Sequence, residues 1–287
     1  MSVTAIVRKD FRDGIRSKLL WSLMALFLLS IGGFTYLATR GSPEGEGDIV
    51  LLGLLGFSAI FAVIFLIPLT GLIVSIKSIV REREMGSIRI LLSLPHTRGE
   101  VILGKFLGRS GLLTAAILTG FVPAALILFV QTGELPVFEY VALVLVTILF
   151  GVVFVAIGVT VSAFTSTETR ATVAGVAVFF LFYLWDSIFG YVNGQLDLFT
   201  GDLYLFILRF DLFVIFMDVL FAILSLRHDI PNTSFVDANQ FFVENPEAVD
   251  TVSQPFYLQH WFAILILAAW IAVPLAIGYL RFENADL

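Results

Sequence analysis

Long apolar runs separated by short polar connections dominate the sequence and predict membrane-spanning helices. A helix needs roughly 20 apolar residues to cross a hydrocarbon layer about 30 Å thick. Six runs are long enough, at residues 19–39, 49–76, 106–130, 140–164, 171–189 and 261–280. Because the second run is long and contains Pro68, we expect it to be tilted or kinked. The pattern therefore predicts an all-α polytopic membrane protein with six transmembrane helices.

The distribution of Lys and Arg predicts the orientation of these helices. Five basic residues precede the first span, and seven lie around the connection between the second and third spans. The first and third connections, residues 41–48 and 131–138, contain no basic residue. The positive-inside rule then places both termini in the cytoplasm. We expect the membrane to be the plasma membrane.

The segment between the fifth and sixth spans, residues 195–260, is open to two interpretations. Residues 203–226 are apolar but contain Arg209, Asp211 and Asp218, which are expensive to bury in lipid. We expect an external amphipathic or re-entrant helical segment, since protein can cover irregular backbone at membrane depth. The alternative is a seventh span, which would move the C-terminus outside.

Composition supports a membrane domain and argues against several kinds of ligand and reaction. Of 287 residues, 59% are hydrophobic and 14% are charged, whereas soluble domains have roughly 25% charged residues. The net charge of −6 argues against a nucleic-acid partner, and the absence of cysteine excludes disulfides and thiolate chemistry. His96, His228 and His260 are far apart and show no metal-ligand spacing. With no hydrolase motif either, we expect no enzyme activity, metal or cofactor in this chain.

One string imitates a phosphate-binding loop. Residues 99–106, GEVILGKF, follow the pattern GxxxxGK[ST] until Phe106, which offers no hydroxyl for magnesium. No strand precedes Gly99, although a phosphate cradle requires a strand, a loop and a helix N-terminus. Lys105 is expected to anchor a membrane helix at the lipid headgroups instead. The sequence thus predicts no nucleotide site.

The connection between the second and third spans, residues 81–100, predicts a short docking helix. Met85, Ile88, Leu91 and Leu92 recur at helical spacing, charged residues decorate the remaining surface, and Pro95 ends the helix. This pattern favours docking against another protein. The alternative, a helix lying on lipid, requires a basic face that the acidic residues of this segment dilute.

A second amphipathic helix is predicted at residues 1–18. Apolar residues occupy one side, and the opposite side is basic, with Arg8, Lys9, Arg12 and Arg16. Such a helix suits an anionic membrane surface, and docking to the same protein partner is an equal alternative. Gly104 and Gly108, four residues apart in the third span, would permit close approach of another helix.

The loop between the second and third spans also carries a family motif. It has two glutamates, a glycine with a small hydroxyl residue, a leucine-rich turn ending in proline, and an arginine before Gly-Lys at the next span. In these residues the chain resembles the permease subunits of type-2 ATP-binding-cassette (ABC) transporters, in the branch of the permease for nitrous-oxide-reductase maturation. The resemblance implies a coupling helix that contacts an ATPase through Glu82, Arg83, Glu84, Met85, Gly86, Ser87, Ile88, Leu91, Leu92, Leu94, Pro95 and Arg98.

The resemblance further implies the permease half of an exporter. A second permease copy, as homodimer or heterodimer, and a separate ATPase that binds ATP and magnesium would complete it. Residues 19–287 would form the six-span permease domain, and Arg209, Asp211 and Asp218 would belong to an external gating segment. Two alternatives remain: an ion-coupled secondary transporter using Asp186, Asp211 and Asp218, and a membrane anchor or scaffold.

Overall fold

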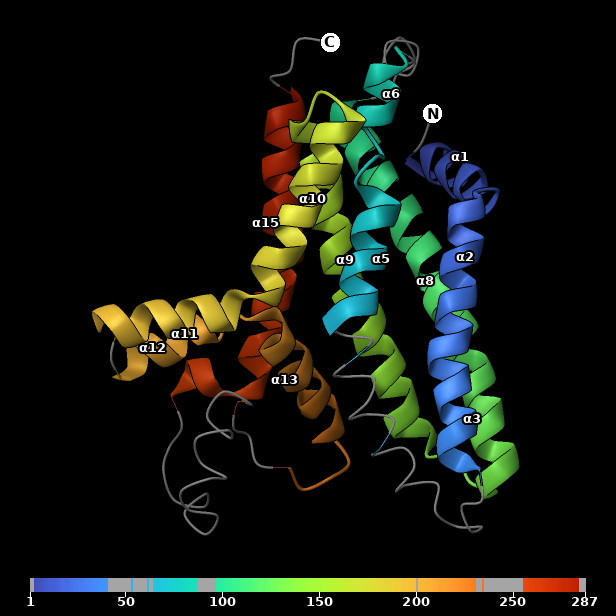
Figure 1. Cartoon of the computed structure of the whole chain (residues 1–287), viewed down its shortest axis with the longest axis vertical. Coiled ribbons are helices and arrows are strands. Elements are labelled where there is room, and N and C mark those ends of the chain that lie inside the picture. The colour runs from blue at the N-terminus through green and yellow to red at the C-terminus, as the bar shows by residue number, and fades with distance from the viewer. Residues whose placement is uncertain are drawn as a thin grey trace. The chain divides into compact units, whose positions relative to one another are not determined.

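Helices form all the regular secondary structure in the part of the chain that the structure describes. The computed structural model describes residues 3–40, 53, 61, 64–86, 97–199, 201–230, 234 and 255–283, and no strand occurs in these ranges. The chain divides into two compact units (Figure 1). Unit 1 contains Met1–Ala177 and Trp270–Leu287, and unit 2 contains Val178–Ala269.

Unit 1 contains most of the long apolar helices. It begins with α1 (Val3–Ile15) and a continuous rod made of α2 (Lys18–Phe27), a π-helical turn (Leu28–Gly32) and α3 (Gly33–Thr39). It continues with α5 (Ile67–Ser75), α6 (Val80–Glu84), α8 (Arg98–Thr132) and α9 (Val137–Phe164). Two helices cross the boundary between the units, α10 (Glu168–Tyr183) and α15 (His260–Glu283).

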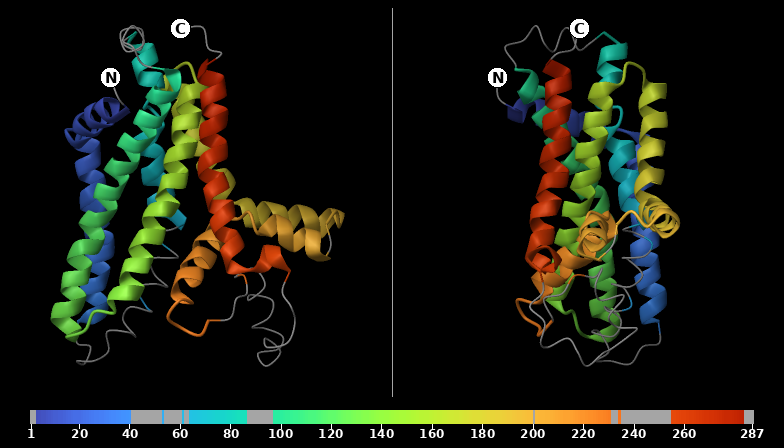
Figure 2. Two further views of the ribbon diagram at one scale, coloured as in Figure 1. Left: turned by 180° about the vertical axis from the view of Figure 1, so that it is seen from behind. Right: turned by 90° about the vertical axis from the view of Figure 1, so that its left-hand side faces the viewer.

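α8 organises unit 1. Its 35 residues rise about 52 Å, more than the roughly 30 Å of hydrocarbon, so the helix extends beyond the membrane. A capping box of Thr97 and Glu100 starts it, and Gly133 in the left-handed conformation ends it. The α2–α3 rod, α5 and α9 all pack on α8 (Figure 2), where Leu113 and Ile117 are fully buried.

Several helix ends gather at one end of unit 1. α1, α6, the start of α8 and the C-terminal end of α15 all lie there (Figure 1). α1, the first described helix, and the C-terminal end of α15, the last one, therefore lie on the same side of unit 1. The predicted topology, with both termini on one side, requires this arrangement.

Among the described residues, five helical segments are long and apolar enough to cross a membrane, and a bent pair brings the number to six. The five are Lys18–Thr39, Ile64–Glu84, Arg98–Thr132, Val137–Phe164 and His260–Glu283, which agree with five of the predicted spans. Residues 49–63 of the second predicted span lie outside the described residues apart from Gly53 and Phe61.

The fifth predicted span is bent, whereas the sequence predicted one continuous helix. Instead of one helix over residues 171–189, α10 ends at Tyr183, and α11 (Trp185–Leu196) continues after a bend of 60°. Apolar composition continues across the break, which is why hydropathy did not reveal it. Polar residues become frequent only within α11, where Asp186 is exposed.

Unit 2 contains the segment for which a seventh span was the alternative. α12 (Gly201–Leu208) ends before Arg209, and α13 (Leu212–Leu224) starts after Asp211. With 13 residues, α13 is shorter than the roughly 20 that a span needs. Residues 203–226 are therefore two short helices joined by a turn, and the alternative of a single seventh span is wrong.

Candidate functional site

α6 is the described beginning of the predicted docking loop, and it is fastened to the end of α9. The hydroxyl of Ser162 accepts hydrogen bonds from the backbone N–H groups of Ile79 at 2.9 Å and Val80 at 3.0 Å. The guanidinium of Arg83 donates to the carbonyl of Thr165 at 3.0 Å. The start of the loop and the end of α9 are thus held together by several hydrogen bonds.

We expect Ser162→Ala to lower the free energy of unfolding by about 1–3 kcal/mol, because two buried N–H groups lose their acceptor. Thermal unfolding of the purified protein measures this loss. Ser166→Ala removes an exposed hydroxyl from the same region and is the control, with an expected change within about 0.5 kcal/mol. Equal stability of the two variants would contradict the role given to Ser162.

α6 also contacts the start of α10, through Glu168. The backbone N–H of Glu168 donates to Glu84 Oε2 at 3.0 Å. The Glu168 carboxylate lies 3.0 Å from Lys77 Nζ and 3.8 Å from Arg81 Nε. Because these side chains are partly exposed, each pair contributes at most about 1 kcal/mol. Their effect is to orient α6 relative to the beginning of α10.

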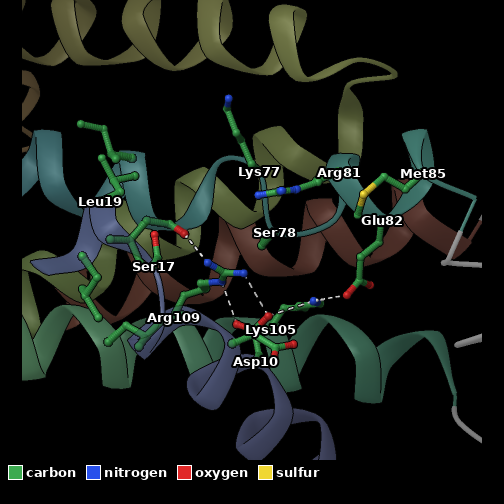
Figure 3. Close-up of a pocket in the computed structure, with 16 residues that line it drawn as sticks. Asp10, Ser17, Leu19, Lys77, Ser78, Arg81, Glu82, Met85, Lys105 and Arg109 are labelled. Carbon is green, nitrogen blue, oxygen red and sulfur yellow. Dashed lines mark hydrogen bonds and ion pairs between the residues drawn. The ribbon is translucent and has the colours of Figure 1, made fainter.

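Asp10, Glu82, Lys105 and Arg109 form a buried ion cluster that joins α1, α6 and α8 (Figure 3). Lys105 Nζ lies 2.9 Å from Asp10 Oδ1 and 2.7 Å from Glu82 Oε1. Arg109 Nε lies 2.7 Å from Asp10 Oδ2. The side chains of Lys105 and Asp10 are 5% and 4% exposed. Two positive and two negative charges offset one another, which makes their burial tolerable.

α1 lies close against α8 because glycines leave room at the contact. A Cβ atom added to Gly104 would lie 2.6 Å from Ile6 Cγ2, and one on Gly108 would lie 3.0 Å from Asp10 Cβ. Both distances are too short or very tight for carbon atoms. The close helix approach predicted at Gly104 and Gly108 is therefore confirmed, and the approaching helix belongs to the same chain.

These contacts correct the interpretation of Lys105 and show what part of α1 packs against. Lys105 is not an anchor at lipid headgroups, since it is buried in the ion cluster. The apolar side of α1 faces protein in part, because Ile6 is 3% exposed where it packs on α8, whereas Ile15 is 36% exposed. The basic side of α1 is exposed, as its sequence predicted, at Arg8, Lys9, Arg12 and Arg16.

The remaining residues assigned to the coupling helix divide into three groups. Arg98 donates to the carbonyl of Phe282 at 2.7 Å and so holds the end of α15. Met85 and Gly86 are exposed; α6 ends at Glu84, and Gly86 follows with a φ of 72°. The others lie outside the described residues: Ser87, Ile88, Leu91, Leu92, Leu94 and Pro95.

A second buried ion pair lies in unit 2, between Arg209 and Asp218, both with fully buried side chains. Arg209 also donates to the hydroxyl of Ser234 at 2.7 Å and to the carbonyl of Tyr257 at 2.8 Å. Asp218 Oδ1 lies 3.5 Å from Nδ1 of His260. Burial lowers the pKa of Arg209 to about 10, so the guanidinium stays charged at neutral pH. This network ties the α12–α13 turn to the beginning of α15.

Asp211 has a local structural role. Its carboxylate accepts hydrogen bonds from the N–H groups of Phe213 at 2.8 Å and Val214 at 3.0 Å, so it caps α13. Burial raises the pKa of Asp211, while these two hydrogen bonds oppose the rise. The three charged residues of the predicted gating segment are thus held by contacts within unit 2.

Sequence reasoning missed Asp10, Arg109 and Ser162 as site residues. Asp10 lies midway between Ile6 and Gly14 at a spacing of four, on the buried side of α1. An acidic residue on the buried side of an amphipathic helix was a signal for a basic partner. No local pattern pointed to Ser162, because serine is ordinary inside membrane helices.

Comparisons with known proteins place the sequence among relatives. The sequence profile described as "ABC-2 family transporter protein" matches residues 4–287. A protein named probable ABC transporter permease protein NosY, from Stutzerimonas stutzeri, is 33% identical over 191 residues. These cover 62% of this chain and 66% of that protein. The protein of the same name from Pseudomonas aeruginosa is 32% identical over 200 residues, which cover 63% of this chain and 67% of that protein.

The matched length supports assignment to a family. The profile covers nearly the whole chain, including the loop at residues 81–100 and the segment at residues 195–260. The first relative is matched over slightly less than two thirds of its own length. The chain belongs to the ABC-2 family of transporter proteins, in the branch of the NosY permeases.

Proposed function

We propose that this chain transmits the motion of a separate ATPase to a pathway that exports a substrate across the plasma membrane. The observation that carries the proposal is the attachment of α6 to three other helices. Glu82 contacts Lys105 of α8, Arg83 contacts the end of α9, and Glu84 contacts the start of α10. A force applied to the loop at Met85 and Gly86, which are exposed, would therefore reach three spans at once.

α1 belongs to the same proposed transmission unit. The buried ion cluster connects it to α6 and α8, so it moves with them. Its exposed basic side is available to the anionic membrane surface or to the ATPase. A helix held on one side by charge pairs and on the other by the membrane surface would keep the loop at a fixed height relative to the bilayer.

The proposed assembly contains two permease copies and an ATPase that binds ATP and magnesium. Both relatives are named as permease proteins of ABC transporters, which motivates the search for an ATPase partner. The ion-coupled alternative receives less support, because Asp211 caps a helix and Asp218 pairs with Arg209. A carboxylate that binds a coupling ion must be able to exchange its partners.

Co-purification with the ATPase encoded nearest to this gene tests the proposal. Gly86→Asp combined with Leu92→Asp is expected to weaken ATPase binding roughly tenfold or more and to abolish transport, because it places charge in the proposed docking surface. Ser166→Asp adds charge to an exposed position nearby and is the control. If the double variant retains the ATPase and its stimulation, the proposed coupling role of residues 81–100 is wrong.

A further inference from the structure

A cavity of about 400 Å³ opens beside the buried ion cluster in unit 1 (Figure 3). Its walls come from the end of α1, the start of α2, the α5–α6 region and α8. α2 and α5 both pack on α8, and the cavity lies between them. Pockets of this size are large enough for a small ligand or for part of a larger one.

The lining of the cavity changes from apolar to charged along the spans. At the end of the cavity nearer the membrane interior, the lining is apolar and consists of Leu19, Leu20, Ile73 and Leu112. Toward the end of unit 1 where α1 and α6 lie, the lining is charged, with four basic and three acidic residues: Lys77, Arg81, Lys105, Arg109, Asp10, Asp13 and Glu82. A molecule that fills this space must therefore be apolar at one end and charged at the other.

The charges favour an anionic group at the polar end. Lys105 and Arg109 are engaged with Asp10 and Glu82 inside the cluster. Lys77 and Arg81 are different, because their side chains are 46% and 63% exposed; Lys77 Nζ lies 3.0 Å from Glu168, and its ammonium group has two further N–H donors. Arg81 Nε lies 3.8 Å from Glu168, beyond hydrogen-bond distance, which leaves guanidinium N–H groups for a ligand.

An unsatisfied hydroxyl lies in the same wall. Ser78 is 2% exposed, and its Oγ has no hydrogen-bond partner among the described residues. It lines the cavity between Lys77 and Arg81 (Figure 3). A buried hydroxyl without a partner is uncommon in proteins, and a polar group outside the described residues would satisfy it.

We propose that this cavity binds one phospholipid from the leaflet on the side of α1. The phosphodiester lies against Lys77, Arg81 and Ser78, and an acyl chain runs along Leu19, Leu20 and Ile73. Leu19 is 50% exposed, so the apolar end is open to the surrounding lipid and allows lateral entry. The bound lipid would fill the gap between α2 and α5 beside the base of the docking loop.

Lipid retention by the purified permease alone tests the site, so the result does not depend on the ATPase. After delipidation and addition of phosphatidylglycerol, native mass spectrometry counts the phospholipids that remain bound per chain. The wild type is expected to retain one more than the variant Lys77→Ala/Arg81→Ala, whose affinity falls roughly 30-fold. Ile73→Trp fills the apolar end without changing charge and is also expected to lose this lipid.

Two further measurements identify the ligand and control for charge. Arg40→Ala/Arg227→Ala removes the same charge from exposed positions that do not line the cavity, and this variant is expected to keep the lipid. Inorganic phosphate is expected to compete poorly, because it lacks the acyl chain. Equal lipid retention by the wild type and both cavity variants would overturn the proposal. Phosphate binding as tight as that of the lipid would also overturn it and would indicate a free-anion site.

Discussion

Replacing Lys105 by methionine is expected to destabilise the protein by about 3–5 kcal/mol, because the carboxylates of Asp10 and Glu82 lose their shared buried cation. Methionine keeps most of the side-chain volume, so the loss reports charge rather than a cavity. The free energy of unfolding in mixed micelles measures the effect. We also expect loss of transport, since α1 would no longer be held against α6 and α8.

The critical comparison is between Lys105→Met and a variant that also lacks the two carboxylates that Lys105 contacts. The triple variant Lys105→Met/Asp10→Asn/Glu82→Gln removes both uncompensated carboxylates and is expected to recover most of the stability. Lys9→Met is the matched control, because Lys9 is exposed and lies 3.8 Å from the same Glu82. A loss of stability for Lys9→Met as large as that for Lys105→Met would contradict the assignment of the buried cluster.

Arg209→Met is expected to have an effect of similar size in unit 2. It leaves Asp218 fully buried without its cation and removes the donor that Ser234 and the carbonyl of Tyr257 share. The expected loss is about 3–5 kcal/mol in the free energy of unfolding, with a lower thermal midpoint and weaker transport. Thermal unfolding of the purified chain is the measurement.

A compensated variant separates the ion pair from the packing of unit 2. Arg209→Met/Asp218→Leu removes both charges and is expected to be more stable than Arg209→Met alone. Arg227→Met changes an exposed arginine of the same unit and should stay within about 0.5 kcal/mol of the wild type. If Arg209→Met and Arg227→Met are equally mild, the pair does not hold the α12–α13 turn.

Hydropathy was sufficient for most of the spans because burial in lipid depends on local composition. The rod at Lys18–Thr39 and the helices α8, α9 and α15 each follow one uninterrupted apolar run. The break between α10 and α11 was not predictable in this way, since the residues on both sides of Leu184 are apolar. A bend arises from backbone geometry and neighbouring contacts, which hydropathy does not record.

Charged residues were the harder part of the prediction. Lys105 has the sequence context of a residue at a membrane boundary, and only the docking of α1 on α8 turns it into a buried ion. Asp10 and Lys105 are separated by 95 positions, so no local pattern connects them. Arg209 and Asp218 looked too expensive to bury, but each provides the partner that makes burial of the other possible.

The sequence by itself determined the membrane class, most of the spans, the amphipathic character of residues 1–18 and the family, because these depend on composition, periodicity and short motifs. Only the tertiary structure decided which charges are buried together, that α6 is fastened to three other helices, and that a cavity lies beside it. These features depend on side chains far apart in the sequence meeting at distances of about 3 Å, where hydrogen bonds and ion pairs form. Such distances are set by the packing of whole helices.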